Sequence, residues 1–109
     1  MHELAIAEEI VAIVADRTRG ARVRRIVIEV GQLCAVVPDA MRFCFDLATE
    51  GTVAEGARLD IVEVPGRARC RVCGADVVLE RPFGRCDCGS TDLEWLAGEE
   101  LRIRDVELV

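Results

Sequence analysis

The six cysteines of this 109-residue chain constrain its fold more than any other feature, because four of them stand in two close pairs. Cys70 and Cys73 form a C-x-x-C motif, Cys86 and Cys88 form a C-x-C motif, and twelve residues separate the two motifs. Four thiolates arranged in this way suit tetrahedral Zn²⁺. Because four protein ligands leave no open position for a substrate, we expect the zinc to be structural and to supply folding energy.

Two other interpretations of the cysteines remain open, namely iron bound as in rubredoxin and a redox-active dithiol. The second pair is one residue shorter than C-x-x-C, so its turn must bend differently. Gly74 and Gly89 follow the two pairs, where a metal-binding turn often needs a positive φ. Cys44 is interpreted as a small buried hydrophobic residue. Cys34 is interpreted in the same way, with a further thiol beside the metal as the alternative.

Around this cysteine-rich segment, the apolar residues alternate between helical and strand periodicity. Helical spacing predicts an amphipathic helix over residues 2–18 and a second helix that starts near Pro38 and ends before Gly51. Alternating apolar residues predict strands over residues 23–30, 59–64 and 101–108. The sequence therefore predicts an α+β fold in which two helices pack on a small three-stranded sheet, with an inserted zinc-ribbon-like module.

The inserted segment divides the chain into two predicted domains. Residues 1–64 plus 99–109 form an α/β domain, and residues 65–98 form a metal-binding domain that we expect to be loop-like and too short for a core of its own. The core of the α/β domain is small, and its last strand could pair in cis or with a second chain. We therefore predict a monomer–dimer equilibrium.

Charge and composition exclude several classes of function. The chain has 20 acidic and 14 basic side chains, and an acidic chain without a basic stripe is a poor nucleic-acid binder. No apolar run approaches the roughly 20 residues of a membrane span, and the acidic start of the chain does not resemble a secretion signal, so we expect a cytoplasmic protein. Outside the metal ligands we find no acid/base pair, phosphate loop or nucleophile with a histidine partner. We therefore do not expect an enzyme.

The single histidine stands at position 2. A residue of this size disfavours removal of Met1, so we expect the α-amine of Met1 to remain. This amine, the amide nitrogen of His2 and the His2 imidazole can close adjacent chelate rings on one ion, and such nitrogen-rich sites suit Ni²⁺ or Cu²⁺. The first amides of a helix have no intrahelical partner, so Glu3 could add its amide nitrogen or its carboxylate. The competing interpretation is an inert terminus on a zinc-ribbon adaptor that binds proteins, or on a ribbon that binds nucleic acid.

Several segments together resemble one known family. They are "MHELAIAEEIV", "IEVGQLCAVVPDAMRFCFDLATEGT", "EGARLDIVEVP", "CRVCGAD" and "CGSTDLEWLAGEELRIRDVEL". In this order they are similar to the HypA/HybF family of nickel metallochaperones, which act in [NiFe]-hydrogenase maturation. The chain departs from the family at "CDC", where C-x-x-C is more usual.

The resemblance implies two metal sites and two partners. It implies that Met1, His2 and Glu3 bind Ni²⁺ as transferred cargo, with His2 indispensable. It implies that the four paired cysteines hold structural zinc. The implied partners are a GTPase of the hydrogenase maturation system (HypB-type) and the hydrogenase large subunit, to which the nickel is delivered.

Overall fold

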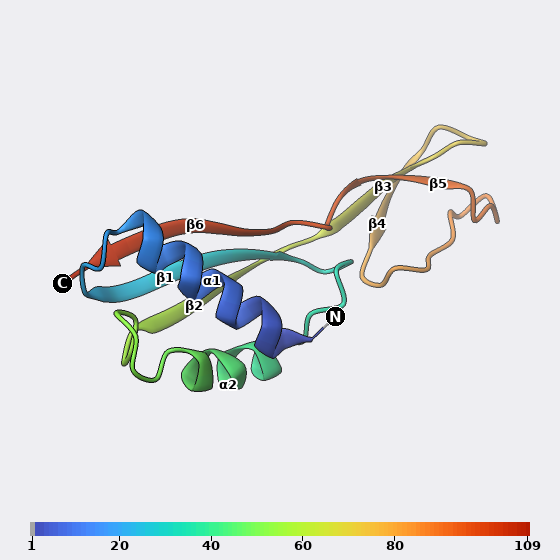
Figure 1. Cartoon of the computed structure of the whole chain (residues 1–109). Coiled ribbons are helices and arrows are strands. Elements are labelled where there is room, and N and C mark those ends of the chain that lie inside the picture. Colours follow the sequence, from blue (N-terminus) through green and yellow to red (C-terminus); the bar gives the residue numbers. More distant parts are fainter. Residues whose placement is uncertain (1) are drawn as a thin grey trace. The chain divides into compact units, whose positions relative to one another are not determined.

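The computed structural model describes residues 2–109. Its elements, in chain order, are α1 (Glu3–Arg17), β1 (Val23–Gly31), α2 (Pro38–Ala48), β2 (Arg58–Val64), β3 (Gly66–Cys70), β4 (Asp76–Leu79), β5 (Leu93–Ala97) and β6 (Leu101–Leu108) (Figure 1). The chain divides into two compact units. Unit 1 contains Met1–Ile28, Val36–Val62 and Ile103–Val109, and unit 2 contains Glu29–Ala35 and Glu63–Arg102.

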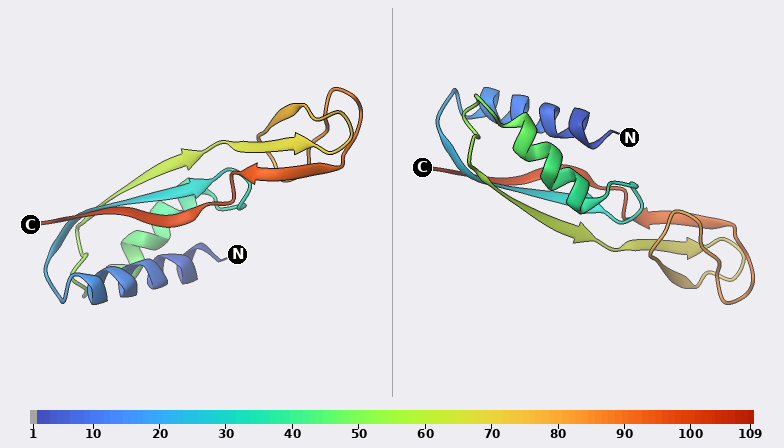
Figure 2. Two further views of the ribbon diagram at one scale, coloured as in Figure 1. Left: turned by 90° about the horizontal axis from the view of Figure 1, so that it is seen from above. Right: turned by 90° about the horizontal axis from the view of Figure 1, so that it is seen from below.

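The first sheet has three strands in the order β2-β1-β6. In unit 1, α1 and α2 pack against each other and lie on the same face of this sheet (Figure 2). The second sheet also has three strands, in the order β4-β3-β5, with β3 antiparallel to both neighbours. The predicted α+β class, with two helices on a small sheet and a separate small module, is confirmed.

Helix α1 begins and ends where the sequence predicts, to within one residue. Its buried side chains recur at helical spacing and belong to Ile6, Ala7, Ile10, Val11 and Val14. Gly20 follows the helix in a left-handed conformation, with φ at 78°, and its N–H donates to the carbonyl of Ala15. The hydroxyl of Thr18 donates to the Val14 carbonyl at 2.7 Å, so the last turn has both side-chain and backbone partners.

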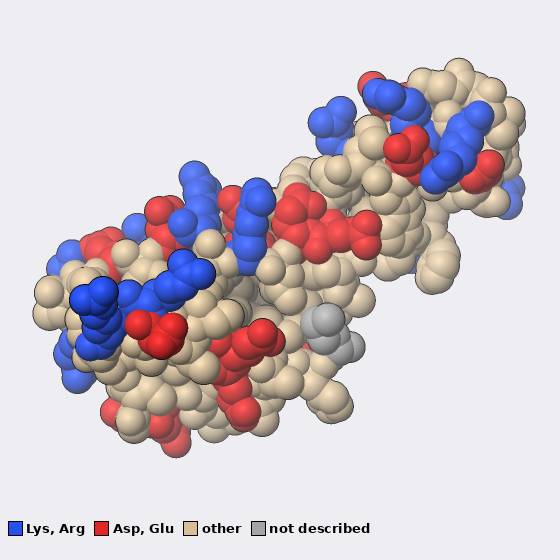
Figure 3. Space-filling model, turned by 45° about the horizontal axis from the view of Figure 1, so that its top comes forward, with Lys and Arg blue, Asp and Glu red and all other residues tan. Residues whose placement is uncertain are grey.

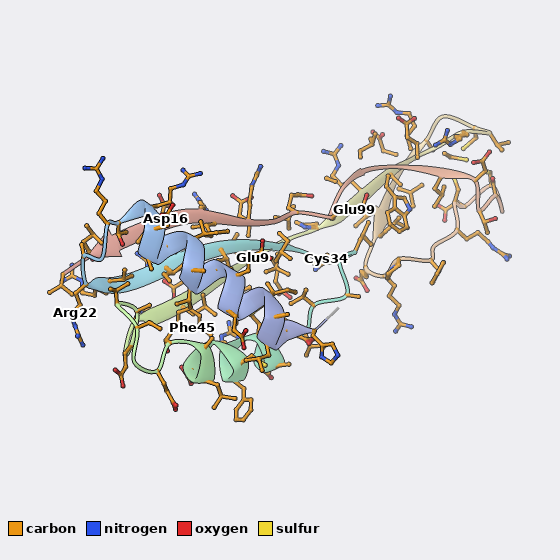
Figure 4. The ribbon with its side chains drawn as sticks, in the orientation of Figure 1. Glu9, Asp16, Arg22, Cys34, Phe45 and Glu99 are labelled. Carbon is orange, nitrogen blue, oxygen red and sulfur yellow. The ribbon has the colours of Figure 1, made fainter. Side chains whose placement is uncertain are left out.

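Helix α2 begins at Pro38, as predicted, because proline in a first turn forgoes no intrahelical hydrogen bond. Its fully buried side chains are Met41 and Phe45, while Cys44, which we expected to be buried, and Ala48 are half-buried. Phe45, labelled in Figure 4, lies on the side of α2 that faces the sheet. Met41 and Phe45 are therefore the main contribution of α2 to the core of unit 1.

The segment between β2 and β6 is not loop-like, and this expectation was wrong. It contains the three strands of the second sheet, and its residues Ala68 and Leu79 form a small core with Leu33, which follows β1. In β3 the buried positions are Gly66, Ala68 and Cys70, whereas the residues between them are exposed. The alternation is present in the sequence, but small residues occupy its buried positions, so it did not indicate a strand.

Two glycines allow the backbones of unit 2 to approach closely. A Cβ atom on Gly31 would lie 1.9 Å from the carbonyl oxygen of Gly98, and Gly98 itself has φ at 110°. The same carbonyl accepts the N–H of Leu33 at 2.8 Å. This contact holds the chain after β1 against the turn between β5 and β6, and so places Leu33 in the core of unit 2.

Charged side chains connect the strands of unit 1. Nε of Arg25 on β1 lies 2.5 Å from Oδ2 of Asp60 on β2, and Nε of Arg58 lies 2.7 Å from Oδ1 of the same carboxylate. Arg24 and Arg25 both pair with Glu107 on β6. Hydrogen bonds from Arg25 and then Arg58 lower the pKa of Asp60, and the hydrogen bond from Arg24 lowers the pKa of Glu107.

Figure 3 shows positive and negative side chains side by side over much of the visible surface, rather than separated into fields of one sign. None of the helices among residues 2–109 is both long and apolar enough to span a membrane.

We expect Phe45→Ala to destabilise the protein by about 3–5 kcal/mol, because a large side chain with 1% exposure would be replaced by a cavity. Phe43→Ala is the matched control, because Phe43 lies on the same helix with 66% of its surface exposed, and should cost less than about 1 kcal/mol. Urea denaturation of the two variants measures the difference. Equal losses would contradict the placement of the core.

Asp60→Asn should flatten the acid side of the stability curve. The pKa of Asp60 is lower in the folded chain than in the unfolded chain. Its ion pairs therefore stabilise the fold above about pH 4, and this stabilisation is lost as the pH falls through the folded-state pKa. Unfolding free energies measured from pH 7 down to pH 3 test this expectation. If the unfolding free energies of the variant and the wild type changed with pH in parallel, the carboxylate of Asp60 would not contribute to the pH dependence of stability.

Candidate metal sites

The four paired cysteines converge in unit 2. The Sγ atoms of Cys70, Cys73, Cys86 and Cys88 all lie within 4.8 Å of one another. The Sγ atoms of Cys70 and Cys88 are 3.7 Å apart, and those of Cys73 and Cys86 are 3.5 Å apart. Sulfurs at the corners of a tetrahedron with zinc–sulfur bonds of about 2.3 Å would be about 3.8 Å apart. The arrangement therefore fits a tetrahedral metal ion such as Zn²⁺.

The two cysteine pairs lie on turns of different size. In the first turn, which follows β3, the N–H of Gly74 donates to the carbonyl of Cys70 at 2.9 Å, and Gly74 has φ at 76°. In the second turn, the N–H of Gly89 donates to the carbonyl of Cys86 at 2.8 Å, and Gly89 has φ at 93°. The first hydrogen bond joins residues four apart and the second joins residues three apart. A tighter turn thus accommodates the shorter C-x-C pair, and both glycines adopt the positive φ that the sequence predicts.

Backbone hydrogen bonds that the cysteine motifs alone do not indicate also fix the cysteines. The N–H of Cys70 donates to the carbonyl of Ala75, and the N–H of Cys86 donates to the carbonyl of Ser90, both at 2.9 Å. Each hydrogen bond joins the first cysteine of a turn to the residue that directly follows the turn glycine, and so connects the two ends of the turn. In the sequence, these contacts could have been found from the position directly after each C-x-x-C-G or C-x-C-G motif.

The cluster is electrostatically costly without a cation. The backbone N–H of Cys73 lies 3.4 Å from Sγ of Cys70 and lowers the pKa of the Cys70 thiol to about 6. The backbone N–H of Ala75 also favours the thiolate of Cys73, but the neighbouring thiols of Cys86 and Cys70 raise the pKa of Cys73 to about 12. Four thiolates this close together repel one another, so they cannot all ionise without a counter-ion. A divalent cation would stabilise all four.

Cys34 and Cys44 lie outside the cluster, since the metal-ligating group found among residues 2–109 consists of the four paired cysteines. Cys34 follows β1, is labelled in Figure 4, and donates through Sγ to the carbonyl of Gly31 at 3.0 Å. Cys44 is half-buried on α2. Neither thiol therefore joins the metal site as a further ligand.

The start of the chain forms the beginning of α1 in unit 1. His2 is the N-cap residue, with extended φ and ψ of −82° and 119°, and its carbonyl accepts the N–H of Ile6 at 3.2 Å. The imidazole of His2 makes no capping hydrogen bond and is exposed. Glu3 is half-buried in the first turn. Met1, the third predicted nickel ligand, lies outside the described residues.

Comparison with known proteins gives one consistent result. The family model for "Hydrogenase/urease nickel incorporation, metallochaperone, hypA" matches residues 1–108. The hydrogenase maturation factor HypA of Trichormus variabilis is 55% identical over 108 residues, which cover 99% of this chain and 96% of the relative. The HypA of Nostoc punctiforme is 53% identical with the same coverage.

Solved structures support the fold. The solution structure of the Ni metallochaperone HypA from Helicobacter pylori has a TM-score of 0.68 to this chain at 23% sequence identity. The match covers 100% of this chain and 98% of that structure. A second solution structure, of HypA protein, has a TM-score of 0.67 at 24% identity. Both share the complete fold described above.

We predict that the purified protein carries about one Zn per chain. Cys70→Ser and Cys88→Ser should each lose most of the zinc, because a tetrahedral site with three thiolates binds far more weakly. Cys44→Ala is the control, and it should keep the full zinc content because Cys44 is not part of the cluster. Elemental analysis after gel filtration measures the ratio. Full zinc content in both serine variants would show that these cysteines are not ligands.

Proposed function

The chain belongs to the HypA family of metallochaperones, which are maturation factors rather than enzymes, and we propose that it carries nickel on its first three residues. In this proposal, Met1, His2 and Glu3 bind Ni²⁺. The ion is then delivered, with the help of a HypB-type partner GTPase, to the large subunit of a [NiFe]-hydrogenase. The observation that carries the proposal is the family match from residue 1 to residue 108, which includes the histidine at position 2.

The conformation at the start of α1 suits chelation. The His2 side chain is exposed and is not used as a helix cap, so forming a metal bond would break no hydrogen bond of the fold. The N–H groups of the first turn have no intrahelical partner, which leaves backbone nitrogens of His2 and Glu3 available. Adjacent five- and six-membered chelate rings from the amine, an amide nitrogen and the imidazole would give the nitrogen-rich coordination that Ni²⁺ prefers.

A terminal site also suits a carrier, because the ion must leave. The end of a chain can separate from its helix at a small cost in free energy, since few contacts hold it. His2 and Leu4 are exposed and Glu3 is half-buried, so the first buried side chain of α1 is that of Ile6. Binding and release would then require little rearrangement of the rest of unit 1.

The cysteine cluster has a different proposed role. We propose that it holds Zn²⁺ permanently, as a structural ion for residues 65–98. Four thiolates complete the tetrahedral coordination and leave no position for an incoming ligand, so exchange of this ion is slow compared with exchange at an open site. The small hydrophobic core of Leu33, Ala68 and Leu79 is too modest to organise the two cysteine turns without the metal.

The remaining parts of the proposal concern location and assembly. We propose that the protein acts in the cytoplasm, where thiols stay reduced and able to bind zinc. We also propose a monomer–dimer equilibrium in solution. Because the family description names urease together with hydrogenase, a urease is the second candidate client.

Any residue added before Met1 should weaken nickel binding severely, by about 100-fold or more, because the amine becomes an amide and the first chelate ring is lost. Isothermal titration of Ni²⁺ into the tagged and the tag-cleaved protein measures this difference. The matched control carries the same residues after Val109, where they should have no effect. Equal affinities for the N-terminally tagged and cleaved forms would rule out the terminal chelate.

Side-chain variants separate the contributions within the terminal segment. His2→Ala should be as damaging as the N-terminal extension, because it removes the imidazole ring nitrogen and one chelate ring. Glu3→Gln should be milder if the amide nitrogen rather than the carboxylate binds the ion. Zinc content is the internal control, and it should stay constant in both variants. Unchanged nickel binding by His2→Ala would favour the alternative of an adaptor with an inert terminus.

A further inference from the structure

Three arginines in unit 2 have no acidic partner. Arg67 lies on β3, and Arg81 and Arg85 lie in the segment after β4, and all three are exposed. Within residues 2–109, no ion pair or side-chain hydrogen bond engages their guanidinium groups, whereas Arg69 and Arg71 of the same unit pair with Asp76 and Asp92. Unpaired arginines are notable in a chain with a net charge of −6.

The same region exposes large apolar side chains. Phe83, between the two loop arginines, is 93% exposed, and Val78 on β4 is 73% exposed. Val78 is the strand partner of Arg67, so these two side chains lie side by side on one face of the sheet. An open groove of about 470 Å³ runs along this region and is lined by Val78, Leu79, Glu80, Arg81, Phe83, Gly84 and Arg85.

Phe83 also lines a second, smaller groove. It has a volume of about 230 Å³, and its lining includes Pro82, Leu93 and Trp95. Phe83 therefore belongs to the lining of both grooves, so a segment bound in either one would contact it. An exposed aromatic side chain in such a position, together with arginine, is typical of the residues that contribute most to protein–protein binding.

The backbone beside the groove also has binding capacity. β4 is an edge strand, because its sheet has the order β4-β3-β5. One side of its backbone thus has no strand neighbour among the described residues, and such an edge can accept an extended segment of another chain. Arginine side chains next to an accepting edge favour a segment that carries carboxylates.

We propose that Arg67, Val78, Arg81, Phe83 and Arg85 form a docking surface for an extended acidic segment of a partner protein, with apolar side chains seated beside Phe83. Charge decides the chemistry of the occupant. The surface has three unpaired arginines against one acidic residue, Glu80, so it attracts carboxylates. The chain as a whole has a net charge of −6, so an acidic segment is attracted by local unpaired arginines and not by the overall charge. The proposal is independent of nickel binding.

The test uses the full-length, zinc-loaded protein and a fluorescein-labelled peptide, Glu-Leu-Glu-Phe-Glu-Leu-Glu. We expect measurable binding by fluorescence anisotropy at about 50 mM salt and much weaker binding at about 500 mM salt, because exposed charges are screened. Arg81→Glu/Arg85→Glu and, separately, Phe83→Ser should each weaken binding by about tenfold or more. The matched control, Arg19→Glu/Arg22→Glu, makes the same change in net charge in unit 1 and should leave binding unchanged.

Amide chemical shifts of the wild-type protein provide a readout that does not depend on variants. The acidic peptide should shift the resonances of residues 67 and 78–85. Shifts confined to other residues, no binding at about 1 mM peptide, or equal weakening by the control variant would each overturn the proposal. Equal binding of a Lys-Leu-Lys-Phe-Lys-Leu-Lys peptide, or of a single-stranded oligonucleotide, would also overturn it. A fall in sedimentation coefficient for Phe83→Ser without peptide would assign the surface to self-association instead.

Discussion

Mutual repulsion among four thiolates is the physical constraint on which unit 2 depends. Their sulfurs lie within 4.8 Å of one another, and the neighbouring thiols of Cys86 and Cys70 raise the pKa of Cys73, so complete ionisation of the cluster is unfavourable without a cation. A divalent cation would turn this repulsion into attraction and would stabilise the two cysteine turns. The strands β3, β4 and β5 are short, and their core contains only three buried apolar residues among those described. Metal–thiolate bonds would therefore add stability that this small buried area cannot supply.

The cysteine cluster and the proposed nickel site differ in how firmly each would hold an ion, and this difference suits their proposed roles. The cysteine cluster is closed, is held by backbone hydrogen bonds from both turns, and contains two buried ligands, Cys70 and Cys86. The proposed nickel site lies at the start of a helix, where His2 is exposed and makes no side-chain capping bond. Coordination that is complete and enclosed retains an ion, whereas coordination at a chain end releases it readily. A carrier protein needs both properties in different places.

Most of the fold could be predicted from periodicity because unit 1 buries large residues at regular intervals. Ile6, Ile10 and Val14 fix the inner face of α1, and Pro38 fixes the start of α2. The strands of unit 2 were missed because their inward positions hold Gly66, Ala68 and Cys70, which carry little hydrophobic signal. Likewise, the close contact between Gly31 and Gly98 joins residues far apart in the sequence, so neither glycine alone indicates it. The domain boundaries at residues 65 and 98 and the nickel ligands stay predictions.

The sequence by itself identified the four cysteines that converge in unit 2, because residue type and spacing are local properties. The C-x-x-C and C-x-C pairs each lie on one turn, and the glycine after each pair has the conformation that such a turn requires. Tertiary structure alone decided how the two pairs come together and which other thiols stay away. It also decided that Arg67 lies beside Val78 while Arg81, Phe83 and Arg85 surround the same groove. These arrangements arise from strand pairing and chain reversal, which bring together residues whose separation in sequence gives no sign of their proximity.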